Sequence, residues 1–297
     1  MAEYNISRRK FLRMTGAFSG AAALTGGVYA YHIEPSMTVV RHHILQTPKW
    51  PAHYAPMNIT IASDFHAGCP SVDLARLKAE VVTINAQGGD AVCLLGDFMN
   101  SVHSNNYYNG GTCMPDEIAG VMSDITAPTF AVLGNHDWKE GRGGALTGAL
   151  NDKGIIVLEN TSAQFEHEGQ GLWLNGLADE TTRLPDYQKS LSDVFNDDPL
   201  ICLAHDPTSF WRIDDRALVT LSGHTHGGQV AVLGTPLWRP SDYRAPSAYN
   251  RGYVHEAGKD LFVTSGIGTS KIPLRFGVRP EIVNLTIEHA LNAPRFI

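Results

Sequence analysis

The sequence is poor in cysteine and in basic residues, and each shortage excludes a class of protein. Four cysteines in a chain of 297 residues do not make a disulfide scaffold. Lys and Arg together number 23 against 30 Asp and Glu, a formal net charge of −7. General nucleic-acid binders are basic, so we expect no nucleic-acid partner. A glycine-rich phosphate loop of the P-loop kind is also missing, which argues against a nucleoside cofactor.

Apolar residues, glycine and histidine are what the chain has in quantity. Hydrophobic residues make up 43% of it, enough at this length for a sizeable core, so general disorder is excluded. The 29 glycines follow no collagen-like period, and many of them lie where an apolar run turns into a loop. Thirteen histidines against four cysteines is an unusual ratio.

The N-terminus predicts a targeting segment. Residues 7–13 read SRRKFLR, and an uncharged run rich in Ala and Gly covers 14–33. Paired Arg8 and Arg9 before a weakly apolar run resemble a twin-arginine export signal, which implies the twin-arginine translocase as a partner and an exported, periplasmic or envelope location. Residues 28–30 offer a cleavage site. The alternative is an uncleaved anchor that associates with the membrane, for which the four glycines of the run are unfavourable.

After this segment, assigned to residues 1–35, short apolar runs alternate with helical patterns. Helical spacing covers Ser71–Gln87 and Met114–Ile125, and residues 164–177 read as a hairpin. The expected strands are Met57–Ser63, Asp90–Leu95, Thr129–Leu133, Gly154–Leu158, Leu200–Ala204, Ala217–Leu221, Leu261–Ser265 and Glu281–Ile287. The pattern predicts one layered α/β domain with two sheets over residues 36–297.

Five of the apolar runs end in Asp, Asn or His, and these residues form the candidate site. They are Asp64 and His66; Asp97; Asn135, His136 and Asp137; His205; and His224 and His226. Ligand sites form at the carboxyl ends of strands in open α/β sheets, so we expect these side chains to meet. Carboxylate, amide and imidazole suit borderline divalent metals. Without His136 and Asp137 the set holds seven candidate ligands, which are too many for one tetrahedral zinc but suit two metals that share a carboxylate.

The five blocks in this order resemble the calcineurin-like metallophosphoesterase superfamily. The family pattern D-x-H, G-D, G-N-H-D/E, H and G-H-x-H stands here as 64–66, 96–97, 134–137, 205 and 223–226. The resemblance implies a four-layer α/β/β/α sandwich with two mixed sheets. It also implies a metal-dependent phosphoester hydrolase with two divalent ions, manganese before zinc, iron or cobalt.

The resemblance also implies a role for each site residue. One metal would be held by Asp64, His66 and His226, the other by Asn135, His205 and His224, with Asp97 bridging both. His136 would face the substrate as a catalytic residue, and Asp137 would orient it through the other ring nitrogen. Asp137 taken alone could equally be a helix cap.

The substrate is expected to be a phosphodiester or pyrophosphate of the cell envelope, lipid-linked or nucleotide-linked. Residues 266–270, Gly-Ile-Gly-Thr-Ser, resemble an exported bacterial subgroup, which implies such substrates. The segment 237–253 interleaves arginines with aromatic residues that could grip a phosphate, or that could simply pack as a loop. The candidate substrate-binding residues are His103, Arg244 and Arg275.

Other functions remain as alternatives. They are a phosphomonoesterase, a nuclease, and a catalytically silent metal-binding protein on the same fold. Cys69 and Cys113 follow the first and second motifs and could approach each other, and the sequence does not fix their redox state.

Overall fold

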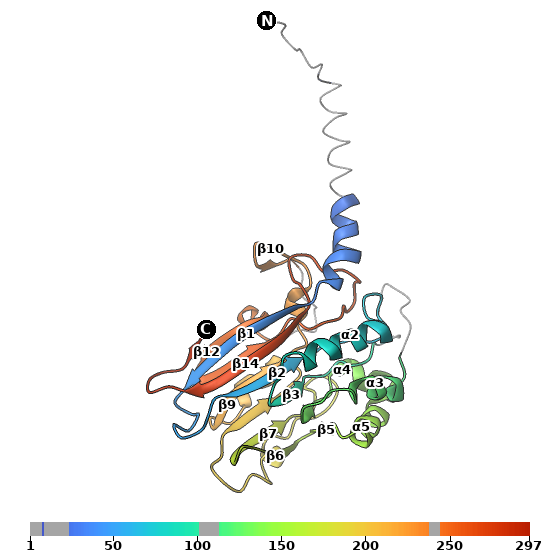
Figure 1. Cartoon of the computed structure of the whole chain (residues 1–297). Helices are drawn as coiled ribbons and strands as arrows, with labels where there is room; N and C mark the ends of the chain where they lie inside the picture. Colours follow the sequence, from blue (N-terminus) through green and yellow to red (C-terminus); the bar gives the residue numbers. More distant parts are fainter. Residues whose placement is uncertain (1–7, 9–23, 101–112, 238–243) are drawn as a thin grey trace, which may run out of the picture.

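A computed structural model describes residues 8, 24–100, 113–237 and 244–297. Its strands form two large mixed sheets and one small ribbon (Figure 1). The seven-stranded sheet has the order β15-β1-β14-β2-β3-β4-β5, with β1 Val39–Thr47, β2 Met57–Ala62, β3 Ala91–Leu94, β4 Thr129–Ala131, β5 Ile156–Val157, β14 Glu281–His289 and β15 Arg295–Phe296. The six-stranded sheet has the order β12-β13-β9-β8-β7-β6, with β6 Thr161–His167, β7 Gln170–Gly176, β8 Leu200–Leu203, β9 Ala217–Ser222, β12 Gly252–Glu256 and β13 Lys259–Val263.

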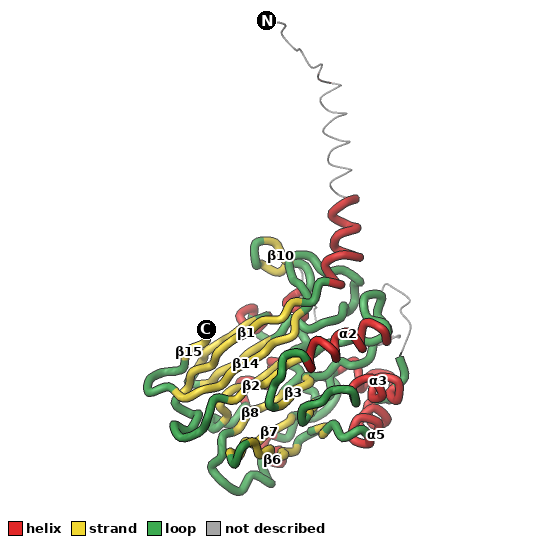
Figure 2. The backbone as a smooth tube through the Cα atoms, in the orientation of Figure 1, coloured by secondary structure: helices red, strands yellow, loops and turns green. Residues whose placement is uncertain are grey.

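The two large sheets pack face to face. The core between them takes Ile59 and Cys93 from the first sheet and Leu174, Ile201 and Leu221 from the second, all buried. Both sheets contain parallel and antiparallel pairs, so the predicted α/β fold with two mixed sheets is confirmed. Strands β2, β3 and β4 are parallel neighbours in the first sheet, and β8 and β9 are parallel neighbours in the second. Loops and turns, green in Figure 2, connect the strands.

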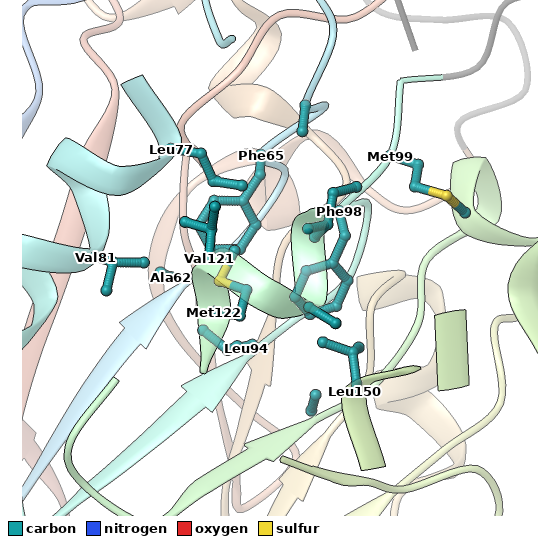
Figure 3. Close-up of a cluster of buried hydrophobic side chains, with 14 of the residues drawn as sticks. Ala62, Phe65, Leu77, Val81, Leu94, Phe98, Met99, Val121, Met122 and Leu150 are labelled. Carbon is teal, nitrogen blue, oxygen red and sulfur yellow. The ribbon is translucent and has the colours of Figure 1, made fainter. Parts of the chain in front are cut away.

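Three helices cover the outer face of the seven-stranded sheet. They are α2 Leu74–Asn85, α3 Pro115–Met122 and α5 Gly143–Asp152. The apolar face predicted for the first of them, including Leu77 and Val81, is buried in a second core cluster, shown in Figure 3. Asp73 ends the preceding loop and caps α2 by accepting a hydrogen bond from the Arg76 backbone N–H.

In the described ranges, the helices on the outer face of the six-stranded sheet are short. They are α6 Tyr187–Ser190 and η4 Pro207–Arg212, over a small cluster that includes Trp173 and Ile213. The fourth layer is therefore thinner than the helical layer on the other side. The remaining elements are η1 Tyr29–Ile33, η2 Glu34–Ser36, α4 Asn135–Trp138, η3 Lys139–Gly141, η5 His226–Gly228, η6 Ser247–Asn250, β10 Ala231–Val232 and β11 Thr235–Pro236.

The N-terminal helical stretch stands at one end of the molecule and contacts the domain (Figure 1). Residues 24–28 are α-helical and continue into η1 and η2. The Ala30 carbonyl accepts a hydrogen bond of 2.9 Å from the Arg275 backbone N–H. The Tyr29 ring meets Phe276 edge-on at a centroid distance of 6.2 Å. Within the described ranges, no helix is both long and apolar enough to cross a membrane.

Candidate metal centre

Five strand ends from both sheets meet to form the site. In the seven-stranded sheet β2, β3 and β4 are parallel neighbours, and Asp64, Asp97 and Asn135 follow them. In the other sheet β8 and β9 are parallel neighbours, followed by His205 and His224. Because the two sheets face each other, their carboxyl ends bring these side chains to one place, as the sequence predicted.

Much of the site backbone lies in the left-handed region, which side chains other than glycine seldom adopt. Positive φ values occur at Asp64 (54°), His66 (47°), Asp97 (52°), His224 (69°) and His226 (52°). Strained backbone persists where the surroundings over-determine it, typically at functional sites. Backbone hydrogen bonds of 2.9 Å join the first two motifs here. The Asp64 N–H donates to the Gly96 carbonyl, and the His66 N–H donates to the Asp97 carbonyl.

Two buried aromatic residues anchor the first two motifs in the core. Phe65 lies between the two ligands of the first motif, and Phe98 directly follows Asp97. Their rings stack with centroids 5.5 Å apart and an interplanar angle of 18°. Figure 3 shows both rings among Leu77, Met122 and other side chains of the helical core. Any shift of this core would therefore move the site.

Asp64, His66 and His226 form one cluster. The Nε2 atoms of the two histidines lie 3.0 Å apart, and Oδ1 of Asp64 lies 3.4 Å from Nε2 of His226. The His224 backbone N–H also donates to both Asp64 oxygens, at 3.0 and 3.1 Å, which fixes the carboxylate. These are the three residues predicted to hold the first metal.

Asn135, His205 and His224 form the second cluster, and Asp97 lies between the two. His224 Nδ1 lies 3.0 Å from Asn135 Oδ1 and 3.3 Å from His205 Nε2. Oδ2 of Asp97 lies 3.3 Å from His205 Nε2 and 3.5 Å from His66 Nε2. One carboxylate thus contacts a histidine of each cluster, which is the arrangement expected of a bridging ligand.

The donor atoms of both clusters fit metal cations. Ring nitrogens that face each other at 3.0 Å and 3.3 Å cannot satisfy one another and the nearby carboxylates with protons alone. The His205 Nδ1 lies 2.6 Å from the Leu95 carbonyl, which directs Nε2 toward Asp97, as outer hydrogen bonds orient metal-binding histidines. Two divalent ions bound here would neutralise phosphoester charge and lower the pKa of water.

Burial and neighbouring charges shift the pKa values of these groups in opposite directions. Burial lowers the pKa of His66, and it lowers the pKa values of His136 and His226 well below the ordinary value. Burial opposes ionisation of Asp97, but His205 and His136 outweigh it and hold the pKa well below its usual range. Burial likewise opposes charge on His205, yet the Asp97 carboxylate raises its pKa well above normal.

His136 lies in the hollow that opens onto both clusters. The hollow is lined by Asp97, Asn135, His136, His224, Thr225, His226, Gly228, Gln229, Ser270 and Lys271. The His136 Nε2 lies 3.3 Å from the Ser270 hydroxyl, and its backbone N–H donates to Asp97 Oδ1 at 2.7 Å. Its ring is therefore placed where a bound phosphoester would lie. His136 also shares a candidate ligand group with His66 and Asp97.

The predicted role of Asp137 does not hold. Its carboxylate oxygens accept hydrogen bonds of 2.9 Å from the backbone N–H groups of Met99 and Gly134, and neither contacts the His136 ring. Because the Gly134 bond closes the first turn of α4, Asp137 acts as a cap that holds the ligand loop. Burial and the nearby Asp97 carboxylate raise the pKa of Asp137 to about 8.

Arg275 does not reach the substrate side. Its side chain is fully buried, and its guanidinium donates to the carbonyls of Ser265, Gly266, Gly268 and Val278. Nη2 also lies 3.4 Å from His226 Nδ1. Burial lowers the pKa of Arg275 to about 10. Arg275 is thus a buried support behind a candidate ligand, because four carbonyls already occupy the guanidinium.

The other predicted substrate residues have separate outcomes. Arg244 is exposed and lines a hollow that also includes Asn135 and Lys139, beside the centre. His103 lies outside the described residues. Tyr249 and Tyr253 of the arginine–aromatic segment pack instead, with hydroxyls that donate to Glu256 and Asp260.

Sequence reasoning missed several residues of the site. Asp206 Oδ2 lies 3.8 Å from Nε2 of His224, on the side away from the second cluster, and it was recognisable only as the neighbour of His205. Ser270 belongs to the Gly-Ile-Gly-Thr-Ser segment, but its approach to His136 depends on β13 lying beside β9. No local signal marked Gln229 or Lys271.

These observations agree with comparisons to known proteins. The family model described as calcineurin-like phosphoesterase matches residues 57–228, and the chain belongs to this family. It is 28% identical over 292 residues to the uncharacterized metallophosphoesterase YkuE of Bacillus subtilis, covering 95% of this chain and 98% of that protein. It is 31% identical over 297 residues to the phosphodiesterase YaeI of Escherichia coli, covering 95% and 99%. A solved structure, TT1561 of Thermus thermophilus, aligns with a TM-score of 0.47 and 15% identity over 72% of this chain and 91% of that one. The family match and the two named relatives make the protein a phosphoester hydrolase of this family.

Proposed function

We propose that the protein is an exported phosphodiesterase or pyrophosphatase that acts on an envelope substrate, lipid-linked or nucleotide-linked. The observation that carries the proposal is the pair of ligand clusters that share Asp97 beside His136 in one hollow. Such a paired centre can stabilise both the attacking and the leaving oxygen of a phosphoester. Manganese is the metal we expect there, before zinc, iron or cobalt.

A diester is favoured over a monoester because basic groups lie beyond the centre. Lys139 and Arg244 line a hollow that begins at Asn135 and also includes Glu180 and Asp206. A group attached to the reacting phosphate could extend toward the two basic residues. The relative named a phosphodiesterase supports the same reaction class. The twin-arginine pattern at Arg8 and Arg9 supports export by the twin-arginine translocase and an envelope substrate.

The test is an assay of the purified full chain, stripped of metal and supplied with manganese, zinc, iron, cobalt or magnesium in turn. A p-nitrophenyl diester should show a higher kcat/KM than the matched monoester. Arg244→Ala should raise KM for the diester, whereas Arg295→Ala on the edge strand β15 should leave it unchanged. Preference for the monoester would favour a phosphomonoesterase, and preference for nucleic acid would favour a nuclease. If the protein binds metal but hydrolyses none of these substrates, the alternative of a catalytically silent metal-binding protein is favoured.

A further inference from the structure

A fully exposed leucine occupies the tip of the β10–β11 hairpin. Leu233 is 100% exposed, and Val232 and Leu237 beside it are 45% and 64% exposed. Both residues of the two-residue turn have positive φ, 50° at Leu233 and 79° at Gly234. Asn or Gly is favoured at the first of these positions, and leucine is strained there. Neither packing nor turn geometry therefore explains the leucine.

The hairpin and the N-terminal helical stretch both contact Phe276. The Ala231 backbone N–H donates to the Phe276 carbonyl at 2.7 Å, and the Tyr29 ring contacts the Phe276 ring. Figure 1 shows β10 beside the helical stretch at the end where the chain enters the domain. The exposed apolar side chains here include Leu24, Val28, Val232, Leu233, Leu237 and Phe276, and we call the surface of these six residues the apolar end.

The surroundings of the apolar end carry a small net positive charge although the whole chain is acidic. Residues 223–237 and 261–280, which flank it, contain no Asp or Glu. Arg41, Arg251 and Arg279 line a hollow between the helical stretch and the sheet, together with Glu34. Arg41 and Arg251 also pair with the buried Glu281, so the unpaired positive charge offered here is mainly that of the exposed Arg279. Apolar side chains rimmed by basic ones are the pattern of a surface that lies in the interface of an anionic membrane.

We propose that the apolar end docks on an anionic lipid bilayer. Leu233 and Phe276 enter the boundary between headgroups and acyl chains, and Arg279 meets headgroup phosphates. A bilayer fits better than a protein partner because the apolar groups are separate protruding tips, which a fluid surface can accommodate. The uncharged run 14–33 leads into the same end, so both features would engage one membrane.

Docking would place the mouth of the metal-binding hollow near the lipid headgroups. Gln229, which lines that hollow, stands two residues before Ala231 of β10, and its carbonyl accepts a hydrogen bond from Phe276 N–H at 2.8 Å. The substrate class that follows is a phosphoester carried by a membrane lipid. This extension rests on the proposed function, whereas the docking itself does not.

Site-specific quenching tests the docking in the full chain. A fluorophore is attached to Leu233→Cys and, as the matched control, to Leu184→Cys, which replaces a leucine 82% exposed and outside the apolar end. The four native cysteines are buried and stay unlabelled. Vesicles of phosphatidylcholine with phosphatidylglycerol carry a quencher on their acyl chains. We expect quenching at position 233 and none at 184, and Arg279→Gln should weaken binding to the anionic vesicles about fivefold.

Three outcomes would overturn the docking. The first is absence of vesicle binding, and the second is binding through the N-terminus with no quenching at position 233. The third is a dimer in solution that shields position 233, which would make a second copy the occupant.

A kinetic comparison separates the docking from the substrate. Leu233→Asp should slow hydrolysis of a vesicle-borne phosphodiester and leave hydrolysis of a soluble p-nitrophenyl diester unchanged, with Leu184→Asp as the control. Quenching at 233 without any vesicle-borne hydrolysis would retain the docking and reject the lipid substrate. If the wild type does not hydrolyse the soluble diester at all, the proposed function is contradicted instead.

Discussion

Asp97 contacts a histidine of each cluster, and His136 contacts the hollow between them, so replacing them should have different effects. Asp97→Ala should abolish binding of both metals and with it the activity. His136→Ala should retain the metals but lower kcat by about 10²–10⁴, as expected for loss of a general acid. Metal content by mass spectrometry and turnover on one diester check both. If His136→Ala loses metal, His136 is a ligand in the group it forms with His66 and Asp97.

Gly134 lies so close to Asp97 and His205 that no side chain fits at this position. A Cβ there would collide with the carboxylate and backbone of Asp97 and with the His205 ring, closer than real Cβ atoms approach other atoms. Gly134→Ala should therefore weaken metal binding by displacing Asp97. Gly148→Ala is the matched control, because Gly148 lies in α5 with nothing nearby, and it should raise the free energy of unfolding by about 1 kcal/mol. Isothermal titration with manganese and urea unfolding measure the two effects, and equal metal affinity in both variants would contradict the explanation.

The sequence predicts which side chains meet at the metal centre far better than it predicts the contacts of the residues that support them. Asp64, Asp97 and His205 were recognisable because each follows a buried strand, and strand ends have little positional freedom. The burial of Arg275 was not, because a guanidinium that satisfies carbonyls in the interior has the same local sequence as one that faces water. The role of Asp137 depended on whether its carboxylate meets backbone N–H groups or the His136 ring, and sequence spacing does not decide that.

Strand β14 begins with a buried carboxylate that joins three elements. Glu281 is 1% exposed and accepts from Arg41 of β1 at 2.9 Å, from Arg251 at 3.1 Å, and from the Ser265 backbone N–H at 2.8 Å. Glu281→Gln keeps the volume but removes the charge. It should lower the free energy of unfolding by about 1.5–3 kcal/mol, the range for hydrogen bonds to charged groups.

The stabilisation by Glu281 should depend on pH. Burial opposes its ionisation, but Arg251, the Ser265 N–H and Arg41 outweigh this and lower the pKa. A carboxyl with a lowered folded pKa stabilises the fold above its unfolded pKa of about 4.3, and this contribution is lost as pH falls through the folded value. The difference between wild type and Glu281→Gln should therefore be full near neutrality and shrink toward about pH 3. Urea unfolding across this range measures it, and a constant difference would refute the ionic contribution.

Elements with a helical period or a continuous apolar run were predicted, and elements with neither were not. Helix α2 lies within the predicted 71–87 because its apolar residues recur at helical spacing. Strand β1 was missed because Arg41, His42 and His43 interrupt any apolar run, and only its nine-residue parallel pairing with β14 makes it a strand. Helix α5 was not predicted because its three glycines are unfavourable in a helix, whereas packing of Leu146 and Leu150 in the core stabilises it.

At the scale of the molecule, the N-terminus should decide where the protein acts. Replacing Arg8 and Arg9 together by lysine keeps the charge but removes the paired guanidinium groups. The double variant should remain in the cytoplasm while its fold and metal content stay unchanged, because neither residue belongs to the domain. Cell fractionation with an activity assay checks this, and normal export would contradict the twin-arginine prediction.

The hydrogen bond from Arg275 to the Ala30 carbonyl has a consequence for the order of maturation. The peptide bond after Ala30 lies inside η1, and Ala30 is buried against the domain. Peptidases require an accessible, unfolded backbone, and a translocase that moves folded proteins would deliver this bond already protected. We therefore expect the exported form to keep residues 1–30 as a permanent tether, with the full-length mass by mass spectrometry. A mature chain beginning at Tyr31 would mean that the segment opens locally before the domain reaches its destination.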